Sequence, residues 1–147
     1  MANKNNVSIG NSGEYFVAAE LERRGFSAAI MMSNAQNFDI LAINRKNYEQ
    51  WAIQVKATKK DKKEWLLSAK NENISNDNIV YIFVSLKNLD APEYHIVHSK
   101  TVTEIIEKGH ADWLEKLGKD GKKHKDSTIR KFNDKDDKYL NNWQLLM

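Results

Sequence analysis

Three polar side chains interrupt two otherwise apolar segments of the chain. Asp39 lies within the run FDILAIN, and Gln54 and Lys56 close the run QWAIQVKA. Because side chains alternate between the two faces of a β-strand, Gln54 and Lys56 point to the same side. A carboxylate among apolar residues costs free energy unless a metal ion or hydrogen bonds compensate it. The types and the spacing of these residues indicate that the three side chains point toward one place in the fold.

The two segments that carry these side chains have the pattern of a β-hairpin. Residues 38–44 and 50–57 are strand candidates, and the polar turn NRKNYE joins them. In such a hairpin the two outer ends lie side by side, so Asp39 is expected near Gln54 and Lys56. The carboxylate, the amide and the amine are then predicted to converge on one point.

The hairpin belongs to a predicted series of helices and strands. Ser12 can cap a helix over about residues 13–24, with Gly25 ending it and Glu14 at its head, after a loose arm over residues 1–11. The remaining strand candidates cover residues 26–32, 78–86 and 94–99, and a partly helical segment covers residues 64–75.

The C-terminal third of the chain is predicted to be mainly helical. One helix opens at Ser99 or Thr101, a second short helix covers ADWLEKL, an exposed loop follows Gly118, and the apolar segment DKYLNNWQLLM closes the fold. Strands that are apolar on both faces, such as IVYIFV, indicate a sheet covered by helices. We predict an α/β domain with a central mixed sheet flanked by helices and a helical C-terminal tail.

The order of these elements, with the residues they carry, resembles the PD-(D/E)XK nuclease superfamily. The matching parts are Glu14 in SGEYFVAAELERRGF, Asp39 in FDI, and Gln54 with Lys56 in QVK. The later segments YIFVSL, YHIVHS and NNWQLL look like those of small bacterial members with a Q-x-K variant of the motif. The resemblance implies a restriction-endonuclease-like core over about residues 12–98, with a C-terminal extension over about residues 99–147, in one domain.

The resemblance also implies an activity, which is metal-dependent hydrolysis of DNA phosphodiester bonds. Asp39 and Gln54, with the backbone carbonyl of Val55 and with Glu14 as a further ligand, would hold Mg²⁺ or Mn²⁺, and Mg²⁺ takes oxygen ligands. Lys56 would orient or help to deprotonate the attacking water, or stabilise charge on the phosphate. Many nucleases of this fold dimerise, so a homodimer is a further expectation.

The sequence departs from the superfamily pattern at two positions. Phe38 replaces the proline, which matters little because that proline is often absent. Gln54 replaces an acidic residue, and its neutral amide oxygen lacks the negative charge with which a carboxylate attracts a cation. A second reading is therefore a catalytically weak or inactive module of the same fold that binds nucleic acid or a protein partner. A third is an interaction or immunity protein that uses the fold as a scaffold.

Charge and composition narrow the class of protein. The net charge is +3, and the segment from Lys56 to Lys63 holds five lysines against one aspartate. Clustered cations suit a polyanionic partner such as DNA, although a solvated surface has the same composition. The candidate phosphate contacts are Lys59, Lys60, Lys62 and Lys63 beside the hairpin, with Lys122, Lys123, Lys125 and Arg130 as a second patch.

The absence of cysteine excludes disulfides and thiolate metal sites. No apolar run approaches a membrane span, and the amino terminus lacks the apolar core of a signal peptide, so we expect a cytoplasmic protein without a membrane partner.

Each site residue also has a plain structural interpretation. Glu14 suits a helix start through the helix dipole, and Asp39 suits hydrogen bonds from the preceding turn NAQN. Gln54 and Lys56 suit a polar strand end that leads into a lysine-rich loop. The nuclease reading rests on the coincidence of all four positions.

Overall fold

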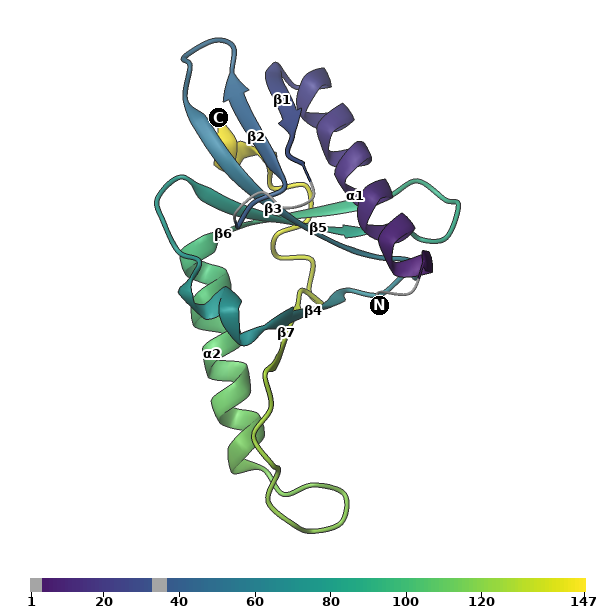
Figure 1. Cartoon of the computed structure of the whole chain (residues 1–147), viewed down its shortest axis with the longest axis vertical. Coiled ribbons are helices and arrows are strands. Elements are labelled where there is room, and N and C mark those ends of the chain that lie inside the picture. The colour runs from purple at the N-terminus through teal and green to yellow at the C-terminus, as the bar shows by residue number, and fades with distance from the viewer. Residues whose placement is uncertain (1–3, 33–36) are drawn as a thin grey trace.

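A mixed sheet of five strands forms the centre of the molecule (Figure 1). The computed structural model describes residues 4–32 and 37–147. Helices (α), 3₁₀ helices (η) and strands (β) follow in the order α1 (Lys4–Arg23), β1 (Phe26–Ile30), β2 (Ile40–Asn44), β3 (Gln50–Thr58), β4 (Glu64–Ser68), η1 (Ala69–Asn73), β5 (Ile79–Ser85), β6 (Glu93–His98), α2 (Ser99–Glu115), β7 (Ile129–Asn133) and η2 (Trp143–Leu146).

The large sheet has the strand order β1-β2-β3-β5-β6. Its neighbouring strands are antiparallel except for β3 and β5, which run parallel. Strands β4 and β7 form a separate antiparallel ribbon. The predicted α/β class with a central mixed sheet is confirmed.

Helix α1 covers one face of the large sheet and buries the larger apolar core (Figure 1). Val17 and Leu21 of α1 pack in one cluster with Val55 of β3. At Gly13 an added Cβ would stand 2.7 Å from the Cβ of Ala57. The helix therefore approaches β3 at a distance that only glycine allows.

The opposite face of the large sheet is covered by α2 and the β4–β7 ribbon (Figure 1). Trp65, Tyr81, Phe83, Ile106 and Phe132 form the second apolar cluster there. Strand β5 is buried on both faces, which explains its continuous apolar sequence. The end of α2, the following loop and β7 extend away from the sheet, and we call residues 109–133 the α2–β7 arm (Figure 1).

Both edges of the large sheet are occupied. At the outer edge of β1, the Ala28 N–H donates to Glu22 at 3.0 Å, and Arg45 donates to the Phe26 carbonyl and pairs with Glu22 at 3.0 Å. At the outer edge of β6, residues 139–142 exchange backbone hydrogen bonds with the strand. Edge strands are thereby shielded from pairing with another chain.

The first helix is longer than the sequence predicts. Helix α1 begins at Lys4, so the expectation of a loose arm is wrong for residues 4–11, and residues 1–3 lie outside the described residues. Ser12 does not cap the helix, because its hydroxyl donates to the Ser8 carbonyl at 2.7 Å within the helix. The additional turns are held by packing, since Ile9 contacts the apolar core.

Two further predictions of secondary structure are wrong, and a third holds only in part. The segment predicted to be partly helical over residues 64–75 is β4 in its first five residues and the 3₁₀ helix η1 in the next five, so the strand was missed there, and β7 lies in the predicted loop. The two short C-terminal helices are one helix, α2, which continues through Gly109. Strands β4 and β7 form because they pair with each other across about 60 residues of sequence.

Among the described residues, no helix is both long enough and apolar enough to cross a bilayer.

Candidate active site

The candidate site lies where β2 and β3 separate. Ile40 is opposite Ile53, so Asp39, directly before β2, is opposite Gln54. The Asp39 N–H donates to the Ile53 carbonyl at 2.8 Å, which is the last backbone hydrogen bond between the two segments at this end. Val55 points toward the same side as Ile53, and its N–H donates to the Asp39 carboxylate at 2.7 Å. The Asp39 carboxylate thus accepts the N–H that a backbone carbonyl of the neighbouring strand would accept in a continuous sheet.

Gln54 and Lys56 lie on the face of β3 opposite to α1. The parallel register places Gln54 beside Tyr81 and Lys56 beside Phe83, and both aromatic side chains belong to the cluster under α2. Gln54 is buried, its Nε2 donates to the Asn37 carbonyl, and its amide oxygen accepts no hydrogen bond within residues 4–32 and 37–147. Lys56 is half-buried.

The two carboxylates of the site, Asp39 and Glu14, both have raised pKa values. Burial raises the pKa of Asp39 above its ordinary value, although the Val55 N–H and the Lys56 ammonium act in the opposite direction. Burial also raises the pKa of Glu14, and the negative charge of Asp39 raises it further. Two carboxylates with raised pKa values lie close enough to repel each other, and such an arrangement favours a cation between or beside them.

The turn NAQN, predicted to provide hydrogen bonds to Asp39, is described only at Asn37. Residues 34–36 of NAQN lie outside the described residues. The hydrogen bond that the structure shows comes from Val55, on the neighbouring strand, so the Asp39 carboxylate is oriented toward β3.

The predicted cationic residues fall into three groups. Lys59, Lys60 and Lys62 are exposed and line a hollow of about 310 Å³ beside the start of α1. Lys63 and Arg130 are engaged elsewhere: Lys63 pairs with Asp137 at 2.6 Å, and Arg130 is buried in an ion pair with Glu72. The last group, Lys122, Lys123 and Lys125, is exposed on the α2–β7 arm, away from the β2–β3 opening (Figure 1).

Sequence reasoning missed a tyrosine beside the site. Tyr81 is fully buried next to Gln54, and its hydroxyl accepts a hydrogen bond from Asn71 of η1 at 2.9 Å. Burial raises the pKa of Tyr81, and the charge of Asp39 contributes to the increase. In the sequence Tyr81 is one of several large residues in an apolar strand, so no signal separates it from core residues.

Sequence reasoning also missed a buried hydrogen bond between His95 and Asp134. Their Nδ1 and Oδ2 atoms are 2.7 Å apart, and neither side chain is more than 3% exposed. The Asp134 carboxylate also accepts the N–H groups of Lys138 and Tyr139. A histidine in an apolar strand is a weak signal, and its partner lies 39 residues further along the chain.

Comparisons with known proteins find similarity only at the level of structure. No family model matches the chain, and no curated protein matches it by sequence. The Holliday junction resolvase Hjc of Archaeoglobus fulgidus is similar with a TM-score of 0.50 and 16% identity, over 85% of this chain and 84% of that chain. The bacterial homing endonuclease I-Ssp6803I is similar with a TM-score of 0.57 and 7% identity, over 99% of this chain and 92% of that chain.

These likenesses cover nearly the whole chain and concern two nucleases. At such low identity they establish the fold and leave the activity open. The resemblance to the PD-(D/E)XK superfamily is therefore confirmed as a resemblance of fold: the chain has a restriction-endonuclease-like nuclease fold.

Proposed function

We propose that the protein is a divalent-metal-dependent nuclease that hydrolyses DNA phosphodiester bonds. The observation that carries the proposal is the Asp39 carboxylate, held by the Val55 N–H at the opening between β2 and β3, with a raised pKa and with Glu14 within reach of its charge. The fold, which two known nucleases share, supports it.

The donor set fits a hard cation such as Mg²⁺ or Mn²⁺. Asp39 and Glu14 offer carboxylate oxygens, Gln54 offers its amide oxygen, and Val55 offers a backbone carbonyl that points to the same side as its N–H. Among residues 4–32 and 37–147, no three His, Cys, Asp or Glu side chains group as a metal site. Few protein ligands suffice, because Mg²⁺ usually keeps several waters.

A bound divalent ion would supply Lewis-acid stabilisation of the phosphate and a more acidic water. Asp39 would hold its ligand oxygen in place, because the Val55 N–H fixes the carboxylate. Lys56 projects from the same face as Gln54 and attracts negative charge at the site, as its effect on the Asp39 pKa shows. In the proposed reaction its ammonium orients the attacking water and stabilises charge on the phosphate.

The proposed substrate contacts beside the site are Lys59, Lys60 and Lys62. They are exposed, and they surround a hollow that a phosphate group can enter. Lys63 and Arg130 are left out of this proposal because each already neutralises a carboxylate. Phosphate contacts of this kind give affinity that falls with salt and carry no sequence preference.

The test is cleavage of supercoiled plasmid, branched DNA and single-stranded DNA in Mg²⁺ or Mn²⁺. Asp39→Ala and Lys56→Ala are expected to abolish cleavage. Asp112→Ala on the α2–β7 arm and Lys46→Ala in the turn at the far end of the β2–β3 hairpin, which change an exposed aspartate and an exposed lysine, are expected to preserve it. Cleavage that survives in the site variants would assign the activity to a contaminant and refute the proposal.

A second candidate function is a binding module that keeps the fold without hydrolysis. The observation that favours it is Gln54, whose neutral amide is buried and tied to the Asn37 carbonyl at the position where the superfamily pattern has a carboxylate. Binding of DNA in either metal without any cleavage, unchanged in Asp39→Ala, would favour this module. Lack of DNA affinity even at low salt would leave only a protein partner.

The homodimer stays a prediction. Because Glu22 and Arg45 cap β1 and residues 139–142 cover β6, a dimer would have to use a surface other than the edges of the large sheet.

A further inference from the structure

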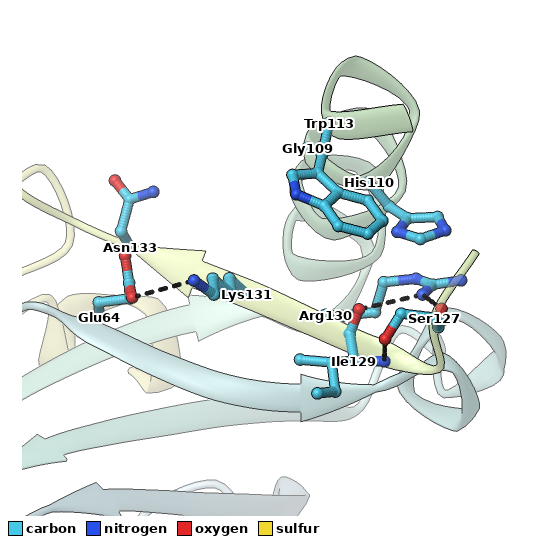
Figure 2. A pocket seen from close by; sticks show the side chains of 9 residues that line it. All are labelled: Glu64, Gly109, His110, Trp113, Ser127, Ile129, Arg130, Lys131 and Asn133. Atoms are coloured by element: carbon cyan, nitrogen blue, oxygen red, sulfur yellow. Dashed lines mark hydrogen bonds and ion pairs between the residues drawn. The ribbon is translucent and has the colours of Figure 1, made fainter. Parts of the chain in front are cut away.

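A second concave site lies on the α2–β7 arm, away from Asp39. It is a groove of about 380 Å³ between the C-terminal half of α2 and the β4–β7 ribbon. Trp113 and His110 form its wall on α2, and Ile129, Lys131 and Asn133 form its floor on β7. Figure 2 shows the indole and imidazole rings directed from α2 toward the strand, with Ile129 and Arg130 below them.

Two histidines hold the wall of this groove in place. The His110 Nε2 is 2.9 Å from the Asp126 carboxylate, and the His124 Nδ1 is 2.8 Å from the Trp113 carbonyl. The His124 ring also stacks on the Trp113 ring, with centroids 4.2 Å apart. The loop after α2 is thus folded back onto the helix, so the groove is formed before any ligand arrives.

Trp113 differs from the other tryptophans of the chain. Trp51, Trp65 and Trp143 are buried in the two apolar clusters and are at most 7% exposed. Trp113 is 37% exposed and belongs to neither cluster. The indole stacks on His124 and also, with ring centroids 5.7 Å apart, on His110, so a planar ligand would stack on the part of the indole that borders the groove.

The segment that joins α2 to β7 is rich in lysine. Between Lys116 and Lys131 the chain holds seven Lys or Arg side chains against two Asp. Arg130 is paired with Glu72, and Lys131 lies 3.8 Å from Glu64. The other five are Lys116, Lys119, Lys122, Lys123 and Lys125; all are exposed, and none of them forms an ion pair within the described residues.

We propose that the groove binds an unpaired nucleotide of a single-stranded polynucleotide. The base lies between Trp113 and Ile129, and the neighbouring phosphates contact the lysines of the loop. An aromatic platform bordered by free cations is the combination that single-stranded nucleic acids require. An acidic peptide would match the positive charge, but it has no planar base to stack on Trp113. The groove acts independently of hydrolysis at Asp39.

The test uses the fluorescence of the full-length wild-type protein in a metal chelator, so that no DNA is cleaved. Because Trp113 is the one tryptophan exposed to solvent, oligothymidylate of about eight nucleotides, within the range of known single-strand site sizes, is expected to quench the most red-shifted part of the emission. An oligouridylate of the same length shows whether the sugar matters.

Two variants examine the role of the ring. Trp113→Leu is expected to lose the quenching and to bind a fluorescein-labelled oligothymidylate about 5- to 150-fold more weakly, and Trp113→Tyr is expected to restore most of the affinity. Circular dichroism and thermal unfolding of each variant verify that the arm is folded. Equal affinity of wild type and a folded Trp113→Leu overturns the proposal, as does equally strong competition by polyglutamate of the same charge.

The outcome is separable from that of the proposed nuclease activity. Asp39→Ala is expected to bind the oligonucleotide like the wild type, because Asp39 lies at the opening between β2 and β3, outside the groove. Plasmid cleavage without quenching would refute the groove and leave the nuclease standing. Quenching without cleavage would do the reverse.

Discussion

Asp39 and Asp134 are two aspartates with opposite environments. Asp134 is 4% exposed, and its carboxylate is shared among His95 and the N–H groups of Lys138 and Tyr139 at 2.7–2.9 Å. Among the described residues, the Asp39 carboxylate accepts one N–H, from Val55, and its pKa is raised. An aspartate with every oxygen engaged holds the chain in place, whereas one that is only partly engaged remains available to a ligand.

The difference follows from where each residue stands in the fold. Asp134 comes directly after β7 and binds the turn that leads the tail over β6, so its partners are fixed by the chain itself. Asp39 stands where two strands separate, and within residues 4–32 and 37–147 only the Val55 N–H donates a backbone hydrogen bond to its carboxylate. The comparison predicts opposite responses to mutation.

The largest expected effect is at Asp134. Asp134→Ala removes the hydrogen-bond partner of a buried histidine and the acceptor of two partly buried N–H groups, so the free energy of unfolding should fall by about 1–3 kcal/mol. Urea denaturation of the variant measures it. Asp134→Asn, which keeps an acceptor oxygen, should lose less. A loss below about 1 kcal/mol for the alanine variant would show that Asp134 contributes no more to stability than an exposed surface ion pair does.

A carboxylate at position 54 should strengthen metal binding. Gln54→Glu adds one negative charge next to Asp39, and we expect the affinity for Mn²⁺ to rise roughly tenfold, or about 1.4 kcal/mol. Isothermal titration calorimetry measures the affinity. Gln50→Glu, which adds the same charge at the exposed start of β3, is the matched control and should leave the affinity unchanged. Equal gains in both variants would show a general charge effect instead of a ligand.

Asp39→Asn should stabilise the metal-free protein, in contrast to any substitution of Asp134. Because burial raises the folded-state pKa of Asp39 above 3.8, the native state binds more protons than the unfolded state between 3.8 and that raised value, and stability falls as the pH rises through this window. The neutral amide avoids this loss. At pH 7 we expect a gain on the order of 0.5–2 kcal/mol, as at other functional sites.

Thermal unfolding of Asp39→Asn with and without Mn²⁺ measures both halves of this prediction. The wild type should gain stability from the ion, and the variant should not. A variant that is less stable than the wild type at neutral pH and equally stabilised by the ion would show that Asp39 is a structural residue like Asp134.

The smallest expected effect is on the titration of Glu14. Burial is the larger cause of its raised pKa and the charge of Asp39 the smaller one, so Asp39→Asn should lower the pKa of Glu14 without returning it to its ordinary value. Carbon-detected NMR of the side-chain carboxyl follows the titration. Asp134→Asn is the control and should leave the Glu14 curve unmoved. Identical Glu14 titration curves in the wild type and in Asp39→Asn would show that the charge of Asp39 does not affect the pKa of Glu14.

The parts of the fold that the sequence predicts are those with strong local patterns. The continuous apolar run of β5 and the alternation of β3 indicate their positions, and the hairpin turn places Asp39 opposite Gln54. Strand β7 has exposed residues at every second position, including Lys131, and is a strand only because β4 lies beside it. Local sequence does not contain that pairing.

The same limit applies to the side chains that matter. The Gln54–Lys56 spacing is local, so a strand model predicts their shared face. The pair of His95 and Asp134, the Asn71–Tyr81 hydrogen bond and the wall at Trp113 depend on segments that meet only after folding. Their residue types gave no reason to connect them in advance.

Gly13 makes the geometry of the candidate site sensitive to a single methyl group. Helix interiors favour alanine over glycine by about 1 kcal/mol, yet a Cβ at this position would meet the Cβ of Ala57 at 2.7 Å. The clash would lift α1 off β3 and carry Glu14, the next residue, away from Asp39. Glycine at position 13 therefore weakens the helix, but it lets α1 lie close enough to β3 for the carboxylate of Glu14 to act on Asp39.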